Sequence, residues 1–97
     1  MKRLVFRRSA IADLRAIAAT TKQRWGDEQA AVYVAGLRDR IKSLRAYPLR
    51  FPVYGSNETG LRKMICGHHM VFYRVSEKEI EVIRILHEAM DFGSQLN

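Results

Sequence analysis

The chain has 97 residues, 47% of them hydrophobic and 28% charged, and its formal net charge is +7. This composition is typical of one folded domain spanning residues 1–97, and it excludes both a disordered chain and a membrane span of ~18 apolar residues. The single cysteine excludes an internal disulfide and the basic opening is not typical of a signal peptide, so we expect a cytoplasmic protein.

The positive charge is concentrated in the first half of the chain. Residues 1–50 hold twelve Lys and Arg against four Asp and Glu, whereas residues 51–97 hold five against six. This excess of positive charge favours an acidic partner, either nucleic acid or an acidic peptide. A basic helix surface that is simply solvated explains the charge distribution equally well.

Two helices are predicted between a short first strand and a proline. Residues 4–6 form an apolar run long enough for a strand, and Ser9 stands where a helix N-cap is expected. Gly26 is placed to end the first helix, Asp27 to cap the second and Pro48 to stop it. The short connection predicts an antiparallel helical hairpin. Both apolar stripes have helical spacing: Ile11, Leu14, Ala18, Thr21 and Trp25, then Ala30, Tyr33, Leu37, Ile41 and Leu44.

The second half of the chain has the periodicity of strands. A loop with two prolines and two glycines over residues 48–60 precedes three β-rich segments, Leu61–Cys66, Met70–Val75 and Ile80–His87. Their short connections predict an antiparallel meander. The predicted fold is therefore α+β with the order βααβββ, a helical hairpin packed on one face of a small antiparallel sheet.

Several chemistries lack the residues that they need. His68 and His69 are neighbours whose side chains diverge, and no HxxxH or CxxC motif supports them, so we expect no metal and no cofactor. Cys66 lies in a predicted strand, where an inert core residue is expected. The GSNETG segment lacks the lysine of a phosphate-binding loop.

Four basic side chains on the predicted sheet remain as candidates: Arg62, Arg74, Arg84 and His87. Strand alternation over residues 82–87 places Arg84 and His87 on opposite faces. Arg84 can bind phosphate or carboxylate through its guanidinium, or it can form a structural salt bridge to a carboxylate such as Glu88 or Asp91. His87 can act as an acid or base in cleaving RNA, or it can end its strand with a hydrogen bond to the backbone.

Three blocks of the chain carry a shared pattern. LVFRRSAIADLRAIAATTKQRWG reads as a strand and a helix, AAVYVAGLRDRIKSLRAYPLRFP as a second helix and a loop, and LRKMICGHHMVFYRVSEKEIEVIRILHEAMDF as three strands with a tail. In this order they resemble the RelE/ParE superfamily of toxin–antitoxin toxins, and the ParE branch in particular. The resemblance covers nearly the whole chain. It implies a toxin that a cognate, ParD-like antitoxin holds inactive in a hetero-oligomer.

The resemblance implies one of two activities. RelE-like members cut messenger RNA on the ribosome, whereas ParE-like members trap DNA gyrase in its cleavage complex. Residues 53–61 hold no Lys or Arg, and the tail after His87 brings two carboxylates and no cation, which opposes phosphate chemistry. We therefore expect a gyrase poison without catalytic residues. The alternatives are a metal-independent mRNA endoribonuclease that uses Arg62, Arg84 and His87, or a degenerate toxin that only binds its antitoxin.

Two binding surfaces are expected. An acidic, apolar segment of the antitoxin should bind a groove on the basic hairpin, and the candidate residues there are Trp25, Tyr33, Leu37, Arg38, Lys42 and Arg45. The toxic face is expected in the tail, at His87, Met90 and Phe92, although Met90 and Phe92 can instead pack back onto the sheet. Arg84 is expected either to hold the tail or to contact the antitoxin.

Overall fold

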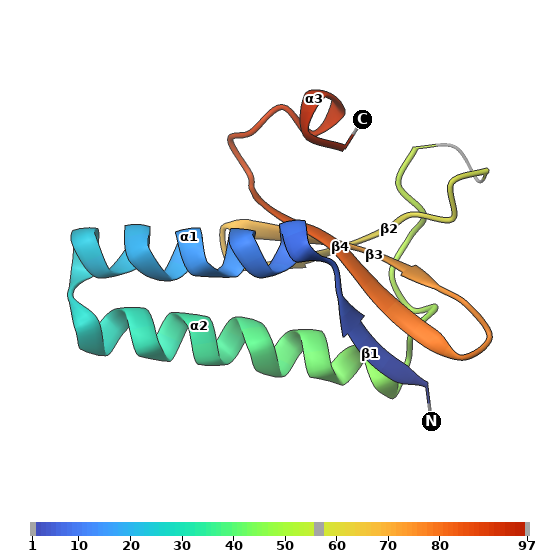
Figure 1. The fold of residues 1–97 in the computed structure, drawn as a ribbon, viewed down its shortest axis with the longest axis horizontal. Coiled ribbons are helices and arrows are strands. Elements are labelled where there is room, and N and C mark those ends of the chain that lie inside the picture. Colours follow the sequence, from blue (N-terminus) through green and yellow to red (C-terminus); the bar gives the residue numbers. More distant parts are fainter. Residues whose placement is uncertain (1, 56–57, 97) are drawn as a thin grey trace.

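The computed structural model describes residues 2–55 and 58–96. A helical hairpin lies against a four-stranded sheet, and a short third helix stands apart from the hairpin (Figure 1). No helix in the described parts of the chain is long and apolar enough to cross a membrane. In chain order the elements are β1 (Arg3–Phe6), α1 (Arg8–Trp25), α2 (Asp27–Lys42), the 3-10 turn η1 (Ser43–Arg45), β2 (Arg62–Cys66), β3 (His69–Val75), β4 (Glu79–His87) and α3 (Phe92–Leu96).

The helical hairpin is confirmed, with small corrections at its caps. Gly26 separates the two helices with φ +91°, a conformation that a glycine adopts without strain. Ser9 was expected to cap α1, but the helix begins at Arg8, and Arg7, two residues before Ser9, occupies the cap position without a side-chain bond. Asp27 is the first residue of α2, so its charge lies in the first turn, where the helix dipole favours an anion.

The sheet has the strand order β1-β4-β3-β2. Strands β2, β3 and β4 form the predicted antiparallel meander, whereas β1 pairs with β4 in parallel. The sheet is therefore mixed and not wholly antiparallel. Periodicity alone does not reveal this, because strand direction depends on the route of the chain through the hairpin.

Each face of the sheet has its own apolar core. The hairpin covers one face with a cluster that includes Leu14, Ile17, Leu37, Ile41, Met64, Val71, Tyr73, Val82 and Ile85. The opposite face carries a smaller cluster of Leu61, Phe72, Ile83 and Leu86, against which Tyr54, Met70, Phe92 and Leu96 pack, and we call it the second core. The tail is therefore a second covering layer. Of the two tail residues for which packing back onto the sheet was an alternative, Phe92 packs there and Met90 stays exposed.

A β-bulge interrupts β4. Phe72 pairs with Arg84 while the next residue of β3, Tyr73, pairs with Val82, so Ile83 is an extra residue. The bulge breaks the strict alternation that the sequence predicted. Arg84 consequently lies opposite Phe72, on the face that the tail covers.

Candidate functional site

The first turns of α1 bind the edge of β4 where β1 ends. Phe6 is the last residue of β1 and pairs with Val82. Beyond that point, Ser9 Oγ donates to the carbonyl of Ile83 at 3.0 Å, and the amide of Ile85 donates to Asp13 Oδ2 at 2.9 Å. Ser9 and Asp13 thus satisfy backbone groups in the part of β4 that extends beyond its pairing with β1.

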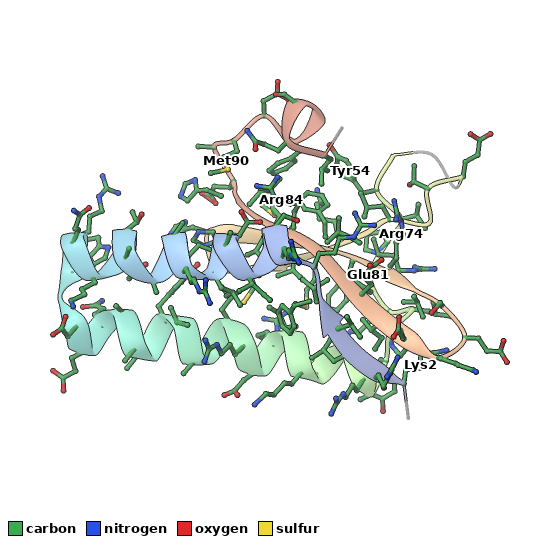
Figure 2. The ribbon with its side chains drawn as sticks, in the orientation of Figure 1. Lys2, Tyr54, Arg74, Glu81, Arg84 and Met90 are labelled. Atoms are coloured by element: carbon green, nitrogen blue, oxygen red, sulfur yellow. The ribbon has the colours of Figure 1, made fainter. Side chains whose placement is uncertain are left out.

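Arg84 connects three elements (Figure 2). Its Nε and Nη2 donate to the two carboxylate oxygens of Asp13 at 2.7 and 2.9 Å, and its Nη1 donates to the carbonyl of Gln95 in α3 at 3.1 Å. The bond to Asp13 raises the pKa of the guanidinium above its ordinary value. The alternative of a structural salt bridge is confirmed for Arg84, but its partner is Asp13 of α1 and not Glu88 or Asp91. Arg84 holds the tail.

The residues of the nuclease alternative do not come together. Arg62 Nη1 donates to the carbonyls of Phe51 and Leu49, at 2.6 and 3.3 Å. His87 Nδ1 accepts the amide of Ala89 at 3.1 Å, which is the strand-ending role. Arg62 and Arg84 lie on strands that β3 separates, and each has its own structural partner.

The tail residues of the expected toxic face differ in exposure. The Phe92 ring packs edge-on against Phe72 and Tyr54, with centroids 5.2 and 6.2 Å apart, so it belongs to the second core. Met90 is 48% exposed and extends from the turn before α3 (Figure 2). Among the three expected residues, Met90 is the one whose side chain is most available to a partner.

An apolar groove with a basic rim follows the seam of the helical hairpin. Two adjoining hollows of about 430 and 510 Å³ share Ala18, Val34, Arg38 and Lys42. We call them together the hairpin groove. Its lining is made largely of small and aliphatic side chains. The other lining residues are Leu4, Phe6, Ile11, Leu14, Arg15, Lys22, Asp27, Ala30, Ala31, Ala35 and Asp39.

The structure distributes the six expected antitoxin-binding residues over several places. Arg38 and Lys42 line the hairpin groove. Leu37 is only 1% exposed, so it belongs to the core and does not border the groove. Trp25 is 64% exposed at the end of α1, Tyr33 packs against the β2–β3 turn, and Arg45 lies exposed in η1.

Sequence reasoning missed an apolar surface after η1. Tyr47 and Leu49 are 69% and 63% exposed and border an open hollow of about 520 Å³ together with Ala46, Pro48 and Arg50. Two large apolar side chains beside a loop proline were the available signal. No group of three or more His, Cys, Asp or Glu in the described residues is arranged to hold a metal ion.

Comparison with known proteins places the chain in a family. Residues 4–92 match the model of the ParE toxin of the type II toxin–antitoxin system parDE. Toxin ParE1 of Caulobacter vibrioides is 38% identical over 96 residues, which cover 99% of both chains. Toxin ParE of Escherichia coli is 38% identical over 90% of this chain and 85% of its own.

Solved structures agree with the sequence matches. A chain of the chromosomal ParDE system from P. aeruginosa is 28% identical, with a TM-score of 0.79 over 90% of this chain and 96% of that one. The RelBE2 toxin–antitoxin complex from Mycobacterium tuberculosis shares the fold at 17% identity, with a TM-score of 0.66 over 89% of this chain and 96% of that one. The chain belongs to the ParE toxin family of type II toxin–antitoxin systems.

Proposed function

We propose that this toxin acts by binding DNA gyrase and stabilising its cleavage complex, and that it does not cut messenger RNA. The observation that carries the proposal is the separate engagement of Arg62, Arg84 and His87. Each of them binds a structural partner, at Phe51, Asp13 and Ala89 respectively. Metal-free RNA cleavage needs an acid, a base and cations that converge on one phosphate. A binding toxin needs only an exposed contact surface.

The target contact is proposed in the tail, with Met90 as its exposed apolar side chain. The second core fixes this region, since Phe92 is packed below it and Arg84 binds the carbonyl of Gln95. A fixed, exposed apolar side chain contributes more to an interface than a mobile one, because less conformational entropy is lost on binding. Phe92 and His87 would then hold the backbone around Met90 in place, without touching the target.

The antitoxin is proposed to occupy the hairpin groove. The groove combines an apolar lining with four cations, which outnumber the two carboxylates Asp27 and Asp39. The cations are Arg15, Lys22, Arg38 and Lys42. An amphipathic acidic segment that folds as it binds matches this surface in both polarity and charge. The neighbouring structure from P. aeruginosa is a ParDE system, which supports a ParD-like partner. Since gyrase is the proposed target, we place the action in the cytoplasm.

Expression of the chain without its antitoxin tests the proposal in cells. We expect growth arrest with induction of a DNA-damage reporter, intact messenger RNA, and recovery when the cognate antitoxin is co-expressed. Arrest with cleaved messenger RNA and a silent reporter would support the ribosome-dependent alternative. Normal growth would indicate a degenerate toxin that only binds its antitoxin.

A further inference from the structure

All three histidines of the chain gather at one end of the sheet. His68 lies in the turn between β2 and β3, His69 begins β3, and His69 pairs with His87 at the end of β4. The ring centroids of His69 and His87 are 5.2 Å apart, and those of His68 and His87 are 6.4 Å apart. The gyrase proposal uses His87 only as a support of the Met90 contact, and neither proposal uses the three histidines as a cluster.

His68 and His87 hold the first turn of the tail. The amide of Glu88 donates to the carbonyl of His68 at 2.9 Å, and Glu88 Oε1 lies 3.2 Å from His68 Nδ1. The amide of Ala89 donates to His87 Nδ1 at 3.1 Å, and the amide of Met90 donates to the carbonyl of His87 at 3.0 Å. The bond from Ala89 requires an unprotonated nitrogen, so it exists only while that imidazole is neutral.

His69 is tied to α2 through Tyr33. The Tyr33 hydroxyl accepts the amide of His68 at 3.2 Å and lies 2.6 Å from His69 Nδ1, to which it can donate its own proton. Tyr33 packs so closely on the turn that a Cβ at Gly67 would lie 2.9 Å from its hydroxyl. This arrangement also favours a neutral imidazole, because a proton on His69 Nδ1 would displace the hydroxyl proton.

The groups around the cluster act on its protonation in opposite directions: burial and the neighbouring imidazoles favour neutral His69, whereas the carboxylate of Glu88 favours its protonated form. Tyr33 faces it from α2, Cys66 from the end of β2 and Glu88 from the tail, so three imidazoles meet one carboxylate. Burial, and then the neighbouring His87 and His68, lower the pKa of His69 below its ordinary value of 6.5. The folded form therefore binds this proton less readily than the unfolded chain. Stability from His69 is complete above pH 6.5, the ordinary value, and is lost as the pH falls from there through the lowered pKa of the folded form.

We propose that His69 and His87 form a proton-sensitive latch, which holds the first turn of the tail at neutral pH and releases it when these two imidazoles become protonated. His68 is not part of the latch, because a proton on its Nδ1 would strengthen its contact with the carboxylate of Glu88. A proton on His87 Nδ1 removes the acceptor of the Ala89 amide, and the imidazolium charges then repel one another. The far end of the tail stays bound, because Arg84 and the second core do not depend on histidine. The release is therefore local, and it re-orients the segment that carries Met90.

Amide hydrogen exchange measured by NMR tests the latch. The protection factor of the Ala89 amide, corrected for the intrinsic rate at each pH, is compared between about pH 7.5 and 5.5. Loss of one hydrogen bond predicts a decrease of roughly fivefold to tenfold in the wild-type chain. In His87→Asn the side-chain oxygen replaces Nδ1 as the acceptor and does not titrate, so protection should become independent of pH. The amide of Val71, in the central strand, reports global opening.

Three results would overturn the latch. Protection of Ala89 that does not change with pH in the wild-type chain would show that the turn is held by other contacts. An equal decrease in His87→Asn would show that this imidazole is not the sensor. A parallel decrease at Val71 would show that acid opens the whole domain. None of these results bears on the target, so the latch and the gyrase proposal can fail separately.

Discussion

At the scale of single residues, one ion pair connects the hairpin, the sheet and the tail. Asp13 accepts two bonds from Arg84 and one from the amide of Ile85, and the two charged side chains are only 14% and 22% exposed. The sequence indicated that Arg84 needed a partner, but it did not identify Asp13. The partners are 71 residues apart, and no local pattern reports a contact over that separation.

Replacement of Asp13 should be costly for stability. Asp13→Ala leaves Arg84 partly buried without its counter-ion and leaves the amide of Ile85 without an acceptor. We expect the free energy of unfolding to decrease by about 2–4 kcal/mol, measured by urea denaturation. Asp39→Ala removes an exposed carboxylate from α2 and should change the free energy of unfolding by less than about 0.5 kcal/mol. Equal effects of the two substitutions would contradict the structural role of Asp13.

At the scale of elements, the sequence predicted the hairpin and the meander because their signals are periodic and local. Helical spacing and Gly26 locate α1 and α2, and alternation locates the three C-terminal strands to within one residue. The bulge at Ile83 and the helix α3 were not predicted, although packing of Phe92 onto the sheet was one of two alternatives. Both depend on what the opposite face of the sheet contacts, and five residues of helix carry too little periodicity to reveal it.

The tail offers a test that separates folding from toxicity. Phe92→Ala removes a ring that packs on Phe72 and Tyr54, and it should lower the free energy of unfolding by about 1–2 kcal/mol. Met90→Ala truncates a side chain that is 48% exposed, so stability should change by less than about 0.5 kcal/mol while toxicity decreases. Urea denaturation and growth assays at matched expression measure both. Full toxicity in a stable Met90→Ala variant would remove Met90 from the target contact.

At the scale of the whole molecule, the charge asymmetry in the sequence becomes the basic rim of the hairpin groove. The sequence predicted that the hairpin carries most of the positive charge. Arg38 and Lys42, two of the residues expected to contact the antitoxin, line the groove. Which apolar residues face outward could not be predicted, because burial depends on how the sheet covers the hairpin. Leu37 and Tyr33 face the sheet side for this reason.

Charge reversal in the groove tests the antitoxin proposal. Arg38→Glu combined with Lys42→Glu should weaken binding of the cognate antitoxin roughly tenfold or more at low salt, since each exposed ion pair contributes up to ~1 kcal/mol. The loss should shrink as salt screens the charges. Arg24→Glu at the end of α1 is the matched control, because Arg24 is exposed and outside the groove lining. Isothermal titration would detect the difference, and equal affinities for all variants would exclude an electrostatic rim.

The most direct test of the central claim uses purified protein on two substrates in parallel: gyrase with supercoiled DNA, and ribosomes that carry a messenger RNA. The account predicts gyrase-linked double-strand breaks and intact RNA, because Arg62, Arg84 and His87 are held in separate structural contacts. Cleaved RNA with normal supercoiling would contradict it and would make these three residues the first to replace.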